Sequence, residues 1–279
     1  MIGAGVIGKT LRDQRGVTVG MSVTVLLIAV GMIALYPQFA DQFADIDLPP
    51  IYEVFFGEAS IDTPAGFFAA EFFGWVPLLI IAIAVIAGTA AIAGEESNGT
   101  IELLLAEPVT RRALLLRKTA GLMLSMAIIA AVSYAGMIVG RLLISEFDLG
   151  YRAMLEATLL MLLLVWFFLA FSILASASLP SRTAAATTVT ALIVLAYLAS
   201  VIASLIDAVA WLEHTTPFGW ADYVEALLHG MPWIEAVALF AFTVAFTWLA
   251  VLLFERRDVG AATWPWQALR RRKLQGDRP

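Results

Sequence analysis

The stretch Gly94–Lys118 reads GEESNGTIELLLAEPVTRRALLLRK and separates two long hydrophobic runs of the chain. It begins with two carboxylates, continues through a flexible Asn98-Gly99 pair and a short apolar segment, and ends with a proline followed by four basic residues. Both flanking runs are long enough to cross a membrane. The stretch is therefore predicted to be a polar loop between two membrane spans.

A short amphipathic helix is predicted inside this loop. Gly99 frees the backbone ahead of it, and Pro108 ends it, because proline lacks an N–H and disfavours helix in the preceding residue. Three apolar residues spaced i, i+3 and i+4 share one face of this helix: Ile101, Leu104 and Leu105. Glu102 lies off that face. Such a helix is expected to dock into a partner protein, and the alternative interpretation is a solvated connector.

The same residues resemble a known family, the ABC type-2 transporter permeases, at their first intracellular loop. In that family the loop holds the coupling helix, which sits in a cleft of a separate ATP-binding subunit and passes its nucleotide-driven movement to the membrane spans. The resemblance holds residue by residue over about 25 residues, and over the rest of the chain it is a similarity of topology. It implies a contact with an ATP-binding subunit through Glu95, Gly99, Thr100, Ile101, Glu102, Leu104, Leu105, Pro108 and Arg111.

Composition places the chain in a membrane. Of its 279 residues 61% are hydrophobic and 14% charged, and the mean hydropathy is +0.88. Soluble domains are roughly 45–50% apolar. The chain is therefore predicted to be a multi-pass protein of the cell membrane. It contains no cysteine, which excludes disulfides, thiolate metal sites and thiol catalysis.

Six uncharged stretches are long enough to span the hydrocarbon core, which takes about 20 helical residues. They are approximately Val17–Tyr36, Trp75–Ala93, Thr119–Gly140, Ala157–Ser178, Ala184–Ile206 and Ala236–Phe254. The sequence therefore predicts an all-α membrane protein with six transmembrane helices in one domain, residues 1–279. The short coupling helix would lie between the second and third spans.

Lysine and arginine predict which side is cytosolic, because positive charges near spans resist translocation. Fifteen of the 17 lie in four segments that six spans place on one side: residues 1–16, 94–118, 179–183 and 255–279. The opposite segments, which include 37–74 and 207–235, hold only Arg141 and Arg152. Both termini and the 94–118 loop are therefore expected in the cytosol. Residues 1–16 are expected to lie on anionic headgroups through Lys9, Arg12 and Arg15, and the basic tail 255–279 on the same leaflet.

The N-terminal GAGVIGKT, residues 3–10, matches two phosphate-binding patterns, a Walker A loop and a dinucleotide fingerprint. Each pattern requires a strand that delivers the glycines and a helix N-terminus that faces the phosphate. Only Met1 and Ile2 precede Gly3, and no alternation of strands and helices follows. The match is therefore interpreted as accidental.

The outer segments contain two local signals. Thr63-Pro64 is typical of an N-cap followed by proline in the first helical turn, so a helix is expected to begin there and to kink at Pro77. Asp222, Glu225 and His229 are spaced i, i+3 and i+7, which could align metal ligands. The favoured interpretation is the solvated face of an interfacial helix.

Ionisable residues are absent from the centres of the six predicted spans. Charges inside spans usually mark ion paths or proton relays, so their absence argues against a proton-driven secondary transporter and an intramembrane protease. Gly136 and Gly140, with Ser133 nearby, predict close approach of another helix to the third span. Met123, Met126 and Met137 are interpreted as packing residues rather than a copper relay.

Together these features predict a permease without an ATPase site of its own. The resemblance implies a subunit of an ATP-driven exporter that works with a cytosolic ATP-binding subunit, which binds ATP and magnesium, and with a second permease copy or homologue. No cofactor or metal is expected in this chain, and its other partners are membrane lipids rather than nucleic acid. The alternative function is a membrane assembly or maturation factor for an extracytoplasmic enzyme that also works with an ATPase.

Overall fold

The computed structural model describes residues 2–43, 63–94 and 110–256, and every regular element in these ranges is a helix. The long helices there are α1 (Ile2–Phe43), α4 (Val76–Ala90), α7 (Arg111–Leu143), α8 (Tyr151–Ser178), α9 (Arg182–Leu205) and α12 (Trp233–Arg256). Shorter helices connect them: α3 (Pro64–Phe68), η1 (Ala69–Phe73), η2 (Asp207–Thr215), α10 (Pro217–Trp220) and α11 (Tyr223–Leu228). The predicted all-α fold is confirmed.

Six segments of the described chain are long and apolar enough to cross a membrane, as predicted. The first two begin earlier than the sequence suggested: the first covers Gly5–Ala40, and the second covers Pro64–Ala90 through α3, η1 and α4. The third helix also starts early, at Arg111. Apolar runs mark only the part of a helix that lies in hydrocarbon, whereas lysine, arginine and leucine continue the helical backbone into the polar interface.

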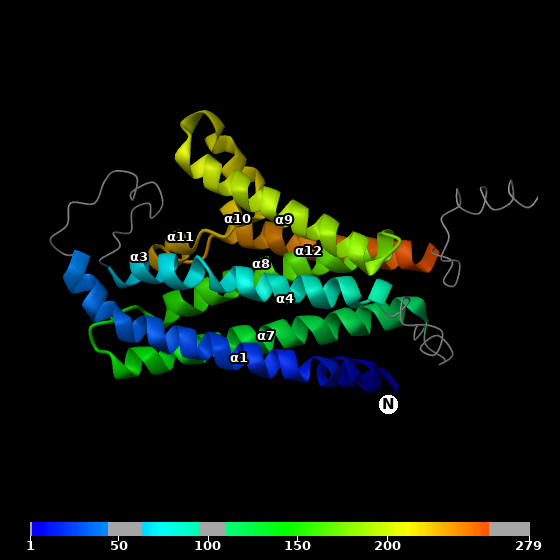
Figure 1. Ribbon diagram of the computed structural model, residues 1–279, viewed down its shortest axis with the longest axis horizontal. Helices are drawn as coiled ribbons and strands as arrows, with labels where there is room; N and C mark the ends of the chain where they lie inside the picture. Colours follow the sequence, from blue (N-terminus) through cyan, green and yellow to red (C-terminus); the bar gives the residue numbers. More distant parts are fainter. Residues whose placement is uncertain (1, 44–62, 95–109, 257–279) are drawn as a thin grey trace, which may run out of the picture.

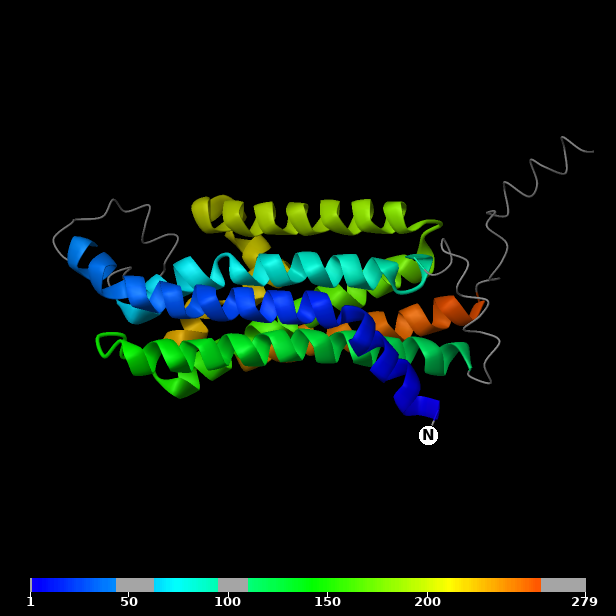
Figure 2. The ribbon, with the colours of Figure 1, turned by 60° about the horizontal axis from the view of Figure 1, so that its bottom comes forward.

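The long helices form a bundle whose ends alternate, as Figures 1 and 2 show. The start of α1, the end of α4, the start of α7 and the end of α12 lie at the same end of the bundle. The two described chain ends, Ile2 and Arg256, are therefore on one side, as an even number of spans requires. The charge distribution predicts that this side is cytosolic.

Helix α8 lies at the centre of the bundle. Within the apolar windows of the spans, 67% of residues are buried in α8 but only 11% in α9. Helix α8 packs against α4, α7, α9 and α12. It is apolar on all sides, which is the pattern of a fully packed helix. Helix α9 lies outside the rest of the bundle, next to α4 (Figure 2).

Small residues hold α7 against α1. A Cβ added at Gly136 would lie 3.1 Å from the Leu26 backbone, and one at Gly140 would lie 2.7 Å from Ile33 Cδ1. The close approach predicted from these two glycines is confirmed, and the partner helix is α1. Glycine permits it because the absent side chains let two backbones pack directly. Met126 and Met137 are buried in the core, as predicted for packing residues.

The first turns of α1 contain residues 3–10 of the phosphate-binding match. These glycines lie within a continuous helix that begins at Ile2. In a Walker A loop they would instead form the turn between a strand and a helix. Figure 2 shows the first part of α1 bending away from the line of the bundle. Further along, α1 continues through Pro37 to Phe43, into the segment 37–74 that was expected to connect the first two spans.

At the opposite end of the bundle, Thr63 is the N-cap predicted from the sequence. Its hydroxyl accepts a hydrogen bond from the Gly66 nitrogen at 3.1 Å, and Pro64 occupies the first turn of α3. The expected irregularity lies just before Pro77 rather than at it. Residues 69–73 form a π-type turn, and α4 then begins anew with Pro77 in its first turn. Proline is tolerated there because the first N–H groups of a helix have no intrahelical partner.

Candidate functional site

The polar loop between the second and third spans has both of its ends at the same end of the bundle. Helix α4 ends at Ala90, the described chain continues to Gly94, and α7 begins at Arg111 (Figure 1). Of the predicted partner-binding residues, Arg111 is described, as the half-buried first residue of α7. The others, from Glu95 to Pro108, lie outside the described residues. The site is therefore built from the base of the loop.

Ser176, in the last turns of α8, fastens the end of α4. Its hydroxyl donates to the Thr89 carbonyl oxygen at 2.9 Å. The Ser176 hydroxyl oxygen also accepts hydrogen bonds from the backbone nitrogens of Ile92 at 3.2 Å and Ala93 at 3.0 Å. Ser176 is completely buried. The last carbonyls of a helix have no intrahelical partner, so this side chain supplies a C-terminal cap from a neighbouring helix.

Lys118 of α7 holds the same turn from the other side. Its Nζ donates to the Ala91 carbonyl oxygen at 2.7 Å. A cation at the C-terminus of a helix is also favoured by the negative end of the helix dipole. Hydrogen bonds made by a charged group contribute about 1.5–3 kcal/mol. The segment that leads from α4 into the loop is thus joined to both α8 and α7.

Helices α4 and α8 approach each other closely just before this turn. A Cβ at Gly88 would lie 2.6 Å from Ser172 Cβ and 3.1 Å from the Leu169 carbonyl oxygen. No larger residue fits without displacement of one of the helices. The end of α4 is therefore positioned by direct backbone packing as well as by the hydrogen bonds of Ser176.

The start of α7 is fixed by a local cap and by a contact with α12. Thr110 Oγ1 accepts a hydrogen bond from the Ala113 nitrogen at 3.2 Å. The Arg112 guanidinium lies over the Trp248 ring, 4.7 Å from its centroid. A cation–π contact of this kind contributes about 0.5–1 kcal/mol at exposed sites. Through these contacts the second end of the loop is connected to α12.

Sequence reasoning missed most of these anchoring residues. Thr110 carries a readable signal, because threonine just before a helix is a favoured N-cap. Ser176 carries none, since its partners lie more than 80 positions away in the chain. Nothing in a run of apolar residues indicates which serine caps another helix.

The spacing Asp222, Glu225 and His229 does not build a metal site. Asp222 caps α11 and accepts a hydrogen bond from the Glu225 nitrogen at 2.9 Å. Glu225 Oε2 lies 2.9 Å from His229 Nδ1. Within residues 2–43, 63–94 and 110–256, no group of three or more His, Asp or Glu side chains could hold a metal ion. The three side chains are exposed, as expected for the solvated face of a helix.

Within the described ranges, the fold defines a class: a multi-pass membrane protein built of helices, with six segments able to span a membrane and anchored chain ends on both sides of the polar loop between the second and the third. Comparison with protein families gives the family within that class. The chain matches the model of the ABC-2 family transporter protein over residues 5–259, so it belongs to that family and is a membrane subunit of the ABC permease type. No curated protein sequence matches it significantly.

Proposed function

We propose that this chain is the permease of an ATP-driven exporter and that the loop 95–109 receives movement from a separate ATP-binding subunit. The observation that carries the proposal is the construction of the loop base. Ser176 and Lys118 join the segment after α4 to α8 and to α7. A loop that transmits force needs such fixed ends, because a freely hinged loop would absorb the displacement of its helix.

Displacement of the loop would pass first to α8. This helix carries Ser176, is the most buried of the six spans, and packs against four other long helices. Closely packed helices move as rigid units, so a shift at the loop would reorient the bundle rather than a single turn. The Arg112–Trp248 contact would carry the same shift to α12.

ATP and magnesium belong to the partner subunit in this proposal, and the chain itself contributes no catalytic group. A second permease copy or a homologue completes the transporter. In this proposal Ile101, Leu104 and Leu105 are the apolar residues that dock on the ATP-binding subunit. Burial of two leucines contributes roughly 3–6 kcal/mol before the cost of ordering the loop.

The test uses the full-length permease reconstituted in vesicles with the ATP-binding subunit that copurifies with it. The double change Leu104→Ser and Leu105→Ser is expected to weaken that association or to leave ATP hydrolysis unstimulated by the permease. Glu102→Lys is expected to have a milder effect, because charges at an interface rim change the association rate more than the affinity. The control is Leu142→Ser, an exposed leucine at the opposite end of α7.

Parental association and parental stimulation in the double variant would contradict the proposal. Accumulation of a substrate inside inverted vesicles after ATP addition separates export from the assembly-factor alternative. An assembly factor would use its ATPase without moving a solute into the vesicles.

A further inference from the structure

Helix α8 makes a polar contact with a distant segment at each of its ends. Ser176 holds the segment after α4 at the loop end, as described above. At the opposite end Glu156, in the second turn of α8, accepts a hydrogen bond through Oε2 from the Met231 backbone nitrogen at 3.1 Å. Met231 lies 75 positions further along the chain, in the short connection between α11 and α12. The central helix is therefore joined to the approach to α12 as well as to the end of α4.

The Glu156 carboxylate is largely withdrawn from solvent. Its side chain is only 13% exposed, although it lies near the end of its helix. Its other oxygen, Oε1, accepts a hydrogen bond from Arg152 Nε at 2.7 Å, one turn earlier on α8, and the Arg152 side chain is 86% exposed. A carboxylate leaves water at a cost unless its oxygens find donors, and an ionised acceptor makes the stronger class of hydrogen bond. Of these two contacts, the one with Met231 reaches another element.

The connection between α11 and α12 is folded in a way that releases the Met231 N–H from α11. The two preceding nitrogens, of His229 and Gly230, both donate to the Glu225 carbonyl oxygen, at 2.8 and 3.1 Å. Gly230 has a φ of 107°, a left-handed conformation that favours glycine. Pro232 follows and has no N–H. Met231 therefore supplies the last backbone donor before α12 begins, and this donor is bound by α8.

Between its two contacts α8 is an uninterrupted helix. Ser176 and Glu156 are 20 residues apart, which corresponds to about 30 Å at about 1.5 Å per residue. That length equals the thickness of a bilayer hydrocarbon core, about 30 Å. The helix contains neither proline nor glycine, at which sharp kinks often occur, and it is the most buried of the six spans. A displacement at one end is therefore expected to reach the other as a movement of the whole helix.

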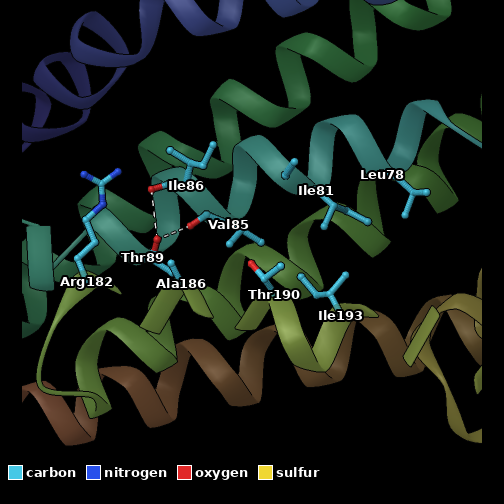
Figure 3. A pocket seen from close by; sticks show the side chains of 10 residues that line it. Leu78, Ile81, Val85, Ile86, Thr89, Arg182, Ala186, Thr190 and Ile193 are labelled. Carbon is cyan, nitrogen blue, oxygen red and sulfur yellow. Dashed lines mark hydrogen bonds between the residues drawn. The ribbon is translucent and has the colours of Figure 1, made fainter. Parts of the chain in front are cut away.

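At the loop end the contact depends on Ser176 rather than on a side chain of α4. Thr89 contributes its carbonyl oxygen, which accepts from the Ser176 hydroxyl at 2.9 Å. The Thr89 hydroxyl is turned back to its own helix, where it donates to the Val85 carbonyl oxygen at 2.7 Å (Figure 3). Figure 3 shows this turn beside an apolar groove between α4 and α9, with Arg182 at one end. The Thr89 side chain is thus engaged within α4.

We propose that Glu156 is a positioning residue that makes the connection between α11 and α12 follow α8, so that movement received at the polar loop reaches the opposite end of the bundle. The inference rests on the proposed function, because it takes the loop 95–109 as the place where movement enters. It is supported by the Ser176 contact, the continuous α8 and the Glu156 contact. The charge distribution predicts that this connection lies on the outer side, where an exporter releases its substrate.

The experiment measures backbone hydrogen exchange by mass spectrometry in the complex of the full-length permease with the ATP-binding subunit that copurifies with it. The complex is compared without nucleotide and after trapping with ATP and orthovanadate. In the parent, trapping is expected to change the exchange of residues 89–93 and of residues 229–233. In Glu156→Ala the change in residues 89–93 is expected to remain, and the change in residues 229–233 is expected to be lost.

The same variant tests the hydrogen bond itself without nucleotide. Glu156→Ala is expected to speed the exchange of the Met231 amide at least about tenfold, because a hydrogen bond to a charged group is removed. Glu156→Gln keeps an oxygen that can accept from Met231 and is expected to restore part of the protection and of the nucleotide response. Glu146→Ala is the matched control and is expected to behave as the parent. Glu146 is exposed at the same end of the bundle, and its carboxylate accepts a hydrogen bond from the neighbouring Ser145 hydroxyl at 3.3 Å.

Three results would overturn the inference while the proposed function stands. They are a nucleotide response of residues 229–233 that survives in Glu156→Ala, a parent in which residues 89–93 alone respond, and unchanged exchange of the Met231 amide in Glu156→Ala. A parent in which residues 89–93 do not respond would contradict the proposed function, and the inference with it.

Gly230→Ala replaces Glu156→Ala if that variant does not yield a stable complex. The added Cβ would lie 3.1 Å from Glu156 Oε2, and a φ of 107° disfavours alanine, so the connection must shift away from the carboxylate. The same loss of the response in residues 229–233 is expected, and a parental response there would overturn the inference.

Discussion

The hydroxyl oxygen of Ser176, near the end of α8, lies 3.0 Å from the backbone nitrogen of Ala93, beyond the end of α4. This contact connects the most buried span of the bundle to the segment that enters the polar loop. The hydroxyl makes three hydrogen bonds, to the Thr89 carbonyl oxygen and to two backbone nitrogens after α4, so its removal leaves these buried groups without that partner.

Ser176→Ala is expected to lower the thermal stability of the purified permease and to reduce its stimulation of the ATP-binding subunit. Each buried group left without a hydrogen-bond partner costs about 1–3 kcal/mol. The control is Ser172→Ala on the same helix. Ser172 is equally buried, but its hydroxyl donates only to the Phe168 carbonyl of its own helix at 2.6 Å.

The two serines are compared by unfolding temperature and by ATPase rate in vesicles. Ser172→Ala is expected to change the stability slightly and the stimulation not at all. If Ser176→Ala stimulates ATP hydrolysis as well as Ser172→Ala does, the hydrogen bonds of Ser176 to the segment after α4 do not transmit movement.

Gly88→Ala tests the close packing of α4 on α8. The new methyl group would lie 2.6 Å from Ser172 Cβ, which cannot rotate away, so the helices must separate. Overpacking of this kind costs typically 1–3 kcal/mol.

Gly31→Ala on α1 is the matched control, because no atom lies within 4 Å of its added Cβ. Alanine there is expected to stabilise the helix by up to about 1 kcal/mol. Equal unfolding temperatures for the two variants would contradict this packing.

The six spans could be predicted from the sequence because a membrane span needs only a continuous apolar run of the right length. The ends of the helices could not, since residues such as Lys9 and Arg111 continue a helix without being apolar. Gly136 and Gly140 predicted close packing correctly, because the absence of a side chain is visible in the sequence. Their neighbours on α1, Leu26 for Gly136 and Ile33 for Gly140, were not predicted, since they depend on which helices pack together.

The anchoring residues and the groove show the same limit. The Ser176 contacts join positions that are distant in the chain, and the groove exists only between the surfaces of α4 and α9. In the sequence, Arg182 is only one of the basic residues that predict the cytosolic side. Its position at the end of an apolar groove follows from the packing of two spans.

The sidedness of the bundle is testable because the chain has no cysteine. Ser145→Cys introduces an exposed thiol between α7 and α8, at one end of the bundle. Thr183→Cys introduces an exposed thiol at the start of α9, at the other end. The first is expected to react with a membrane-impermeant maleimide in intact cells, and the second only after permeabilisation. The reverse pattern would invert the orientation predicted from lysine and arginine.

Tyr223, in α11, allows a prediction about the end of the bundle opposite the polar loop. Its ring stacks on Phe73 with the centroids 4.8 Å apart, and its hydroxyl is buried without a hydrogen-bond partner among the described residues. Burial without a partner is unfavourable for a hydroxyl. Tyr223→Phe keeps the stacked ring and is therefore expected to raise the unfolding free energy by about 1 kcal/mol. Tyr134→Phe is the control and is expected to lower it, because the Tyr134 hydroxyl donates to the Tyr151 carbonyl oxygen at 3.2 Å.

The difference in unfolding free energy between the parent and Tyr223→Phe is expected to depend on pH. Burial raises the pKa of the Tyr223 hydroxyl above its ordinary value of 10.0. Below about pH 10 the tyrosine is neutral in both the folded and unfolded states, so its ionisation contributes nothing to the difference between the parent and Tyr223→Phe. Above about pH 10 the hydroxyl ionises in the unfolded chain only, and the folded parent loses stability as the pH rises. The advantage of Tyr223→Phe should therefore grow between about pH 10 and pH 11, as measured by chemical unfolding of both proteins. A constant difference across this range would mean that the hydroxyl reaches solvent in the folded protein.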